Sequence, residues 1–124
     1  MLNYKTSSEY QECRAYFEWA QYHPTIKEYL IHHVNEGKRS RIMGNLLKLI
    51  GMRKGIPDYQ LPLSNNNWHG FWIEMKTVDE HNKKQKKEQI DWINRLLLVK
   101  QYATFAFGCD DAIRLTLAYI NNKI

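Results

Sequence analysis

Two short stretches of this chain, Gly55-Ile56-Pro57-Asp58 and Glu74-Met75-Lys76, decide its fold, and Glu74 follows Asp58 by sixteen positions. Side chains in a β-strand alternate between its two faces, so Glu74 and Lys76 point the same way while Met75 points to the opposite face. If Asp58 opens the neighbouring strand of a hairpin, its carboxylate meets that of Glu74 at one end of the sheet. The pattern therefore predicts two carboxylates and a lysine gathered at one place on a β-sheet.

Such a group of side chains suits a divalent metal ion. Two carboxylates close together repel each other, and a cation between them removes that cost. Mg²⁺ prefers oxygen ligands, so we expect Mg²⁺, or Mn²⁺ in its place, on Asp58 and Glu74, with the main-chain carbonyl of Met75 as a further ligand. A metal ion in such a site binds a phosphate oxygen and lowers the pKa of a bound water. Lys76 would orient the nucleophile or stabilise the developing negative charge.

Each half of the pattern alone has a simpler interpretation. Glu-x-Lys in a strand is usually a solvated face with a weak ion pair, and Pro-Asp is usually a turn. The combination is more specific, because both halves are expected in strands that a short hairpin joins and because Gly55 precedes the Pro-Asp pair by two residues.

The rest of the chain alternates helical and strand patterns. A helix is expected after a start at Ser7-Ser8-Glu9. The further elements expected, in chain order, are a strand over 29–34, a polar loop over 35–40, a helix over 41–50 that Gly51 ends, a turn and strand over 55–63, a strand over 70–77, a loop over 78–82, a helix from 83 to about 101, a strand over 102–107 and a helix over 111–121 that Asp110 caps. This order predicts an α/β domain in which helices flank a small mixed β-sheet.

Composition limits the class of protein. A chain of 124 residues suits one domain, 1–124, and its 44% hydrophobic and 25% charged residues are typical of an ordinary globular domain. The net charge of +5 favours binding to polyanions, of which nucleic acid is the commonest. Cys13 and Cys109 lack metal-binding spacing and are expected as free thiols in a reducing compartment. No apolar run approaches the length of a membrane span, which is roughly 20 residues, and the sequence shows no signal peptide. We therefore expect a soluble cytoplasmic protein with no membrane partner.

Several motifs taken together resemble the VRR-NUC family, the virus-type replication–repair nuclease branch of the PD-(D/E)xK superfamily. The resemblance covers nearly the whole chain. Residues 8–20 resemble the first helix of stand-alone phage and bacterial members. The basic loop 35–40 and the step from the final strand to the final helix over 107–119 also resemble those members. The most specific motifs are Gly55-Ile56-Pro57-Asp58, Glu74-Met75-Lys76 and Gln89-Ile90-Asp91-Trp92. The resemblance implies a restriction-endonuclease-like core and a protein of a bacterial or phage-infected cell.

The resemblance also implies an activity, which is metal-dependent hydrolysis of DNA phosphodiesters. Stand-alone members resemble Holliday-junction resolvases and are expected to cut branched DNA as homodimers. By motif match, Asp58 and Glu74 correspond to the metal-binding carboxylates, Lys76 to the catalytic lysine and Gln89 to a glutamine that hydrogen-bonds near the active site.

The family further places a glutamate of the first helix near the metal ion. Glu9 and Glu12 are both candidates, because residues three apart lie on one helical face. The match through Phe17-Glu18-Trp19 does not choose between them, and we give a slight preference to Glu12.

Two groups of basic residues are candidates for contacts with DNA phosphates. Positive charge is unfavourable at a helix N-terminus, and bound DNA phosphates would offset the repulsion between the lysines at the expected helix start and the helix dipole. The simpler interpretation of these lysines is a solvated face. The second group flanks a turn at Gly37. The candidates are Lys83, Lys84, Lys86 and Lys87 in the first group and Lys38, Arg39 and Arg41 in the second.

Two alternatives to a junction-resolving nuclease remain open. One is a DNA-binding module that keeps the fold without the activity, against which the intact set of Asp58, Glu74 and Lys76 argues. The other is a restriction-type nuclease that reads a sequence. Specific DNA interfaces usually bury over ~1,000 Å² of protein, which a chain this small would supply most easily as a dimer.

Overall fold

The centre of the molecule is a four-stranded mixed sheet. The computed structural model describes residues 4–34 and 40–124, with side chains of the first helix from Glu9 onward. The strands are β1 (Ile31–His32), β2 (Tyr59–Leu61), β3 (Gly70–Lys76) and β4 (Gln101–Phe107), in the order β1-β2-β3-β4. Pairs β1–β2 and β2–β3 are antiparallel, and β3–β4 is parallel. The predicted small mixed sheet is therefore confirmed.

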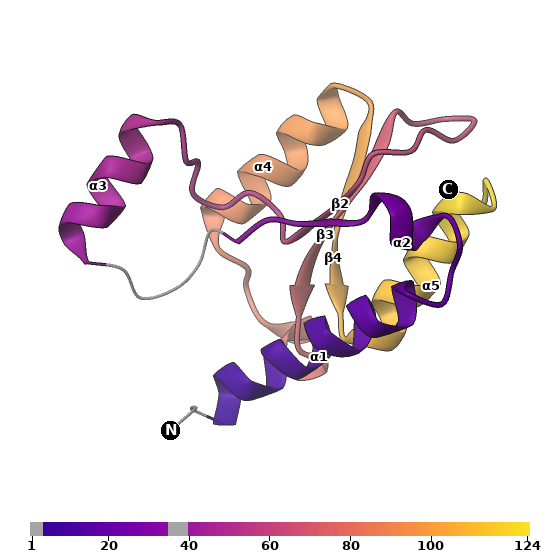
Figure 1. Ribbon diagram of the computed structural model, residues 1–124, viewed down its shortest axis with the longest axis horizontal. Coiled ribbons are helices and arrows are strands. Elements are labelled where there is room, and N and C mark those ends of the chain that lie inside the picture. Colours follow the sequence, from indigo (N-terminus) through magenta and orange to yellow (C-terminus); the bar gives the residue numbers. More distant parts are fainter. Residues whose placement is uncertain (1–3, 35–39) are drawn as a thin grey trace.

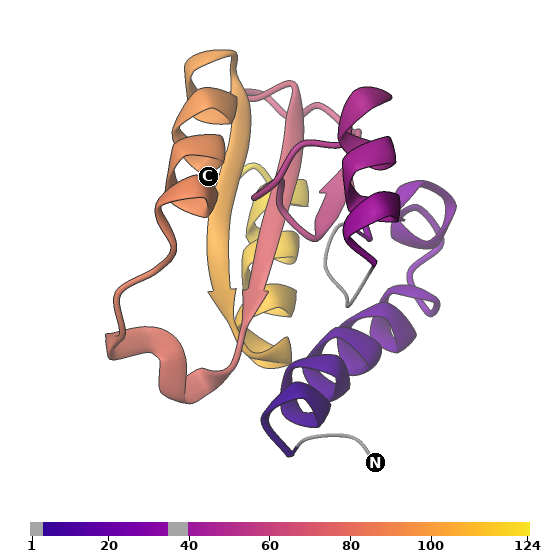
Figure 2. The same cartoon turned by 90° about the vertical axis from the view of Figure 1, so that its left-hand side faces the viewer.

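Helices cover both faces of this sheet. The helices are α1 (Tyr4–Ala20), α2 (Ile26–Tyr29), α3 (Arg41–Leu49), α4 (Lys87–Leu98) and α5 (Cys109–Ile120), with a 3₁₀ helix η1 (Val78–Asn82). Helices α1 and α5 pack together on one face, and α4 covers the other, as Figures 1 and 2 show. The predicted α/β class with flanking helices is confirmed. None of the helices within the described residues is long and apolar enough to cross a membrane.

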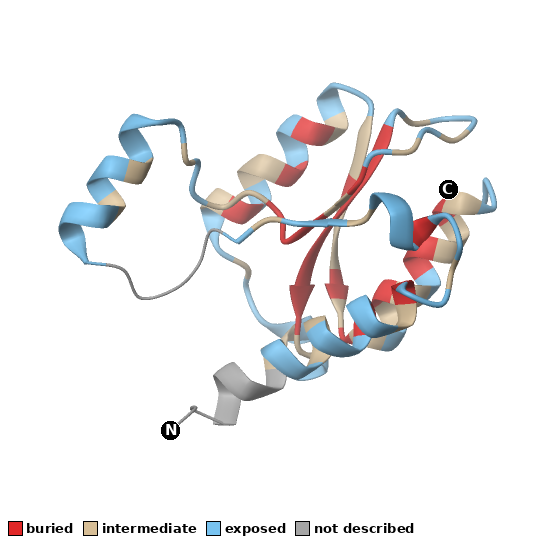
Figure 3. Cartoon of the chain, in the orientation of Figure 1, coloured by how far each residue is buried: buried red, intermediate tan, exposed pale blue. Residues whose placement is uncertain are grey.

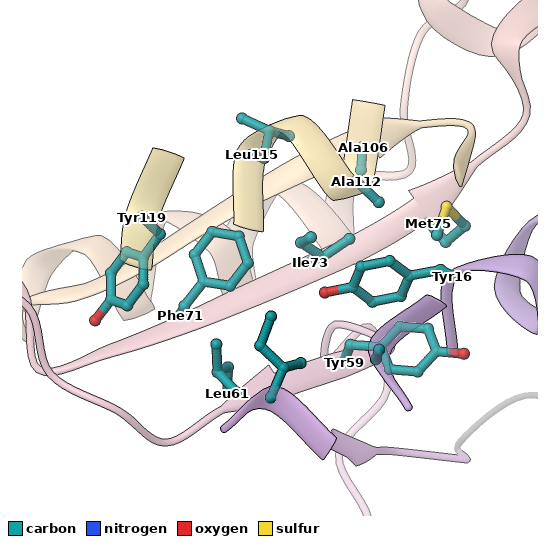
Figure 4. Packing of buried hydrophobic residues seen from close by; sticks show 12 residues of the cluster. Tyr16, Tyr59, Leu61, Phe71, Ile73, Met75, Ala106, Ala112, Leu115 and Tyr119 are labelled. Atoms are coloured by element: carbon teal, nitrogen blue, oxygen red, sulfur yellow. The ribbon is translucent and has the colours of Figure 1, made fainter. Parts of the chain in front are cut away.

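Strand β3 is buried along its whole length, as Figure 3 shows. Phe71, Ile73 and Met75 join the core beneath α1 and α5, which Figure 4 shows with Tyr16 and Tyr119. The alternate residues face α4, where Trp72 packs in a second, smaller cluster. Burying an aromatic or aliphatic side chain contributes roughly 1.5–3 kcal/mol, so both faces of β3 hold the sheet in place. The alternation predicted for this strand fixes which side Glu74 and Lys76 occupy.

Several element boundaries differ from the sequence-based expectations. The helix expected over 83–101 is α4, which begins only at Lys87. The loop expected over 78–82 is instead the 3₁₀ helix η1, which begins with a capping box formed by Thr77 and Glu80. The backbone after η1 remains non-helical as far as Lys86. At the other end, Lys100 with φ 67° separates α4 from β4. The strand expected over 29–34 is shorter, since α2 occupies part of it.

Helix α3 was predicted with accurate bounds, and Gly51 (φ 106°) follows it as expected. Its apolar side chains, however, do not enter the core. Ile42 is 75% exposed, Leu49 82% and the following Ile50 81%, and α3 contains no buried residue. Figures 1 and 3 show α3 standing apart from the rest of the molecule. An apolar stripe at helical spacing shows that a helix has an apolar face, but it does not show what covers that face.

Candidate metal and nucleic-acid site

Asp58 is held at the edge of the sheet by a bond to β3. Its Oδ2 accepts a hydrogen bond from the main-chain N–H of Met75 at 2.8 Å, and the residue is 8% exposed. In the register of β2 and β3, Tyr59 lies opposite Ile73, so one further step places Asp58 opposite Glu74. Opposite residues of an antiparallel pair share a face. The two carboxylates predicted to meet therefore lie side by side.

Glu74 and Lys76 occupy the same face of β3 and are both buried. Glu74 is 2% exposed and Lys76 6%. Removing charged groups from water is costly unless they are paired or bind a metal ion. A buried Asp58–Glu74 pair beside a buried lysine is therefore unusual for a site with only a structural role.

Glu9 of α1 is the third carboxylate at this place. One carboxylate oxygen from each of Glu9, Asp58 and Glu74 lies within 4.8 Å of the other two. Three acidic groups so close repel one another, and a divalent cation among them offsets the repulsion. The three residues come from α1, from the position just before β2 and from β3, so the folded domain is required to assemble them.

Glu12 is engaged elsewhere. Its Oε2 accepts a hydrogen bond from the main-chain N–H of Cys109, the first residue of α5. A carboxylate at a helix N-terminus satisfies a free N–H and complements the helix dipole. This contact explains why α5 begins at Cys109 with Gly108 as its N-cap, and not after a cap at Asp110. Of the two candidate glutamates, the structure thus brings Glu9 to the carboxylate pair, and the preference for Glu12 gives way to Glu9.

The other predicted site residues have separate positions. Gln89, in the first turn of α4, is 2% exposed. Lys38 and Arg39 lie outside the described residues, whereas Arg41 is exposed at the start of α3. Lys83 pairs with Asp79 (3.7 Å) and Lys87 with Asp91 (3.1 Å). The lysines do not crowd one helix start as expected, because Lys83 and Lys84 precede α4, Lys86 is its N-cap and only Lys87 lies within it.

His33 is a neighbour of the site that sequence reasoning did not select. Its N–H donates to the Asp58 carbonyl (2.7 Å), its Nε2 lies 2.9 Å from Gln60 Oε1, and its ring stacks on Trp72 with centroids 5.2 Å apart. It continues β1 on the same face as Asp58. The only signal in the sequence was its place in a predicted strand, which does not reveal the strand partner.

Burial raises the pKa of two neighbours of Asp58, the Cys13 thiol and the Tyr59 hydroxyl. Burial raises the pKa of the Cys13 thiol to about 12, and the negative charge of Asp58 adds to this effect. The Tyr59 hydroxyl donates to the Cys13 carbonyl at 3.2 Å. The Cys13 thiol therefore stays protonated at neutral pH and adds no negative charge beside Asp58.

Gly55 fixes the approach of the chain to Asp58. Its φ is +89°, a left-handed value that favours glycine. A Cβ on Gly55 would lie 2.6 Å from the carbonyl oxygen of Glu88 in α4. The segment before Asp58 thus lies directly against α4, and this contact requires a residue without a side chain.

No family model matches the sequence, and no curated protein matches it either. Among solved structures, the chain is similar to one described as a "VRR_NUC domain protein", with a TM-score of 0.79 and 22% sequence identity over 92% of this chain and 88% of that chain. The chain has the VRR-NUC fold. The resemblance inferred from the motifs is therefore confirmed at the level of the fold. At this identity, the VRR-NUC likeness establishes architecture, and activity has to be argued from the site.

Proposed function

We propose that this protein is a metal-dependent nuclease that hydrolyses DNA phosphodiesters. The observation that carries the proposal is the convergence of Glu9, Asp58 and Glu74 within 4.8 Å, with Lys76 buried on the same strand face as Glu74. This is the arrangement expected of a nuclease centre within a fold that the chain shares with a VRR_NUC domain protein.

The donor atoms fit Mg²⁺. All three side chains offer carboxylate oxygens, which are hard ligands that Mg²⁺ and Mn²⁺ accept, whereas zinc sites favour His and Cys. When bound, a divalent cation would polarise the phosphate and lower the pKa of a coordinated water. The Met75 carbonyl is proposed as a further ligand, since the Met75 N–H already bonds to Asp58 and aligns this part of β3 with the site.

Asp58, Lys76 and Gln89 have separate proposed roles in the site. Asp58 is oriented by the Met75 N–H, so one of its oxygens stays fixed while the carboxylate faces Glu74. Lys76 supplies a positive charge and three donors, which suit the attacking water or a phosphate oxygen that gains negative charge. Gln89, buried in the first turn of α4, is proposed to hydrogen-bond at the edge of this site.

An inactive DNA-binding module would gain nothing from these acids. Three carboxylates repel a phosphate backbone unless a cation lies between them, and burying them weakens the fold. The intact acidic group therefore favours the enzyme over a module that only binds.

Labelled four-way junction, flap and linear duplex DNA, incubated with the purified protein with and without Mg²⁺, test the proposal. We expect cleavage that requires Mg²⁺ or Mn²⁺ and stops with a chelator. Binding to DNA without cleavage of any substrate would overturn the enzyme and favour the binding module. Mapping the cut positions over many sequences separates a reader of DNA shape from a restriction-type reader of sequence.

We further propose that the enzyme acts on branched DNA as a homodimer, with α3 in the interface. Support comes from the five large apolar side chains of α3 and its C-cap that are 48% exposed or more, namely Ile42, Met43, Leu46, Leu49 and Ile50. An isolated helix of nine residues is unstable in water without a packing partner. A second copy presents the same apolar face, so a two-fold pairing of α3 helices would cover both.

Light scattering after size-exclusion chromatography tests the dimer. The double variant Leu46→Glu with Leu49→Glu should halve the mass in solution, because it places charges in the proposed interface. Leu98→Glu is the matched control, since Leu98 on α4 is 84% exposed but lies outside α3. A monomeric wild type, or a double variant that stays dimeric, would contradict this interface.

A further inference from the structure

Two arginines from distant parts of the chain lie over the same indole ring. The Cζ of Arg53 is 5.2 Å from the ring centroid of Trp92, and the Cζ of Arg95 is 5.0 Å from it. Arg53 comes from the segment between α3 and β2, and Arg95 lies one turn after Trp92 in α4. Both arginines are exposed. Among the ion pairs of residues 4–34 and 40–124, none involves either guanidinium.

This arrangement leaves the guanidinium groups available to an anion. Stacking on an aromatic ring uses the flat face of a guanidinium, while its five N–H donors lie in its plane and point outward. Two positive charges next to one ring also repel each other, and an anion between or beside them relieves that cost. By contrast, Lys83 and Lys87 already pair with Asp79 and Asp91.

Chain connectivity limits how far Arg53 lies from the proposed metal site, and Trp92 from Gln89, which is proposed to lie at its edge. Arg53 precedes Asp58 by five residues, which span at most about 17 Å, and that distance corresponds to about five base pairs of duplex along its axis. Trp92 follows Gln89 by three residues, or about 4.5 Å along α4. Figure 1 shows the segment after α3 running past α4 toward β2. The Lys54–Glu88 ion pair (3.4 Å) and the close contact at Gly55 hold it there.

The charge of this segment is uniform. Residues 40–57 include four basic residues (Arg41, Lys48, Arg53 and Lys54) and no acidic one. We propose that Arg53 and Arg95, held on Trp92, bind backbone phosphates of the DNA duplex whose scissile bond lies at Asp58 and Glu74. This inference rests on the proposed nuclease function and adds the residues that position its substrate. Contacts of this kind set the register of DNA without reading its sequence.

Fluorescence anisotropy with a labelled four-way junction, with Ca²⁺ at a fixed concentration to occupy the carboxylates and over a series of salt concentrations, tests the inference. Log affinity decreases as log salt increases, and the magnitude of this slope is smaller by about 0.9 for each lost phosphate contact. Arg53→Gln and Arg95→Gln should each reduce the magnitude of the slope by about 0.9 per bound protomer, or about 1.8 for the proposed homodimer, and weaken binding roughly five- to tenfold per lost contact at 0.1 M salt. Arg53→Lys and Arg95→Lys keep the charge and should retain the slope. Lys27→Gln, on α2, is the control for loss of one exposed charge elsewhere.

The outcomes separate the two proposals. If the wild type binds DNA and cuts it, but both glutamine variants keep the wild-type salt slope, the arginine contacts are wrong and the nuclease stands. If Lys27→Gln lowers the slope as much as Arg53→Gln, the effect is one of net charge and the contacts are again wrong. If the wild type binds no DNA at any salt concentration, the proposed function falls and this inference with it. Because both arginines are on the surface, their variants should melt within a few degrees of the wild type, which thermal unfolding checks.

Discussion

The Asp58 carboxylate and the Met75 main-chain N–H are joined by a hydrogen bond of 2.8 Å. This bond links the two halves of the sequence motif, because Asp58 stands just before β2 and Met75 lies inside β3. It gives Asp58 a structural task beside its proposed metal-binding one, and the two tasks can be separated by substitution.

Asp58→Asn keeps an oxygen that accepts from Met75 but removes the negative charge. We expect its metal-free stability to equal or exceed that of the wild type, because one of three adjacent charges is gone. Its affinity for Mg²⁺ should fall by more than about tenfold. Asp58→Ala should in addition lose about 1–3 kcal/mol of stability, since the buried Met75 N–H loses its acceptor. Calorimetric titration with Mg²⁺ and chemical unfolding measure both effects, and equal stability of the two variants would contradict the structural role.

Glu9→Ala and Glu12→Ala should have opposite effects. Glu9 lies with Asp58 and Glu74, whereas Glu12 caps α5 at Cys109. Glu9→Ala should lower metal affinity and cleavage with little change in stability. Glu12→Ala should retain metal affinity but destabilise the fold by about 0.5–2 kcal/mol, as the loss of a helix cap does. Thermal unfolding and metal titration of the two variants decide which glutamate serves which task, and a loss of metal affinity only in Glu12→Ala would reverse the assignment.

Gly55→Ala should disturb the site through the backbone. The alanine would hold a left-handed φ and bring its Cβ to 2.6 Å from the Glu88 carbonyl oxygen. Gly51→Ala is the matched control, because Gly51 also has a positive φ (106°) but has open space around it. Backbone strain of this kind costs roughly 1–3 kcal/mol, so we expect that loss in the control and a larger one in Gly55→Ala. Equal unfolding free energies would show that the contact with α4 is unimportant.

Tyr16 should make the protein sensitive to alkali. Its hydroxyl bonds to Thr116 Oγ1 (2.8 Å), which joins α1 to α5, and burial raises the pKa of Tyr16 to about 12. The unfolded chain releases this proton near pH 10, so the stability contributed by Tyr16 is complete below pH 10 and is lost as the pH rises towards 12. The loss is about 1.4 kcal/mol per pH unit. Tyr16→Phe should be less stable at pH 7 by about 1 kcal/mol and should lose less stability between pH 10 and 12. An unchanged alkaline slope would contradict this.

Much of the fold could be predicted from local pattern. The alternation of β3 correctly placed Glu74 and Lys76 together, and the turn before Asp58 correctly implied a neighbouring strand. These predictions succeeded because strand periodicity depends only on residues adjacent in the chain.

What the sequence could not predict depends on contacts between distant residues. Glu9 and Glu12 share a helical face, and only the position of α5 relative to α1 separates their tasks. The apolar stripe of α3 does not reveal that no residue of this helix is buried. Arg53 meets Trp92 only because the segment before Asp58 crosses α4 at Gly55.

The single-turnover cleavage rate of junction DNA by a saturating excess of Lys76→Met, with Mg²⁺, tests the central claim most directly. Methionine fills much of the buried volume of lysine but supplies no charge and no donor. We predict a rate about 10²–10³ lower than that of the wild type, as for the loss of one donor that stabilises a transition state, with DNA affinity changed less than about twofold. Cleavage by Lys76→Met at the wild-type rate would contradict the account.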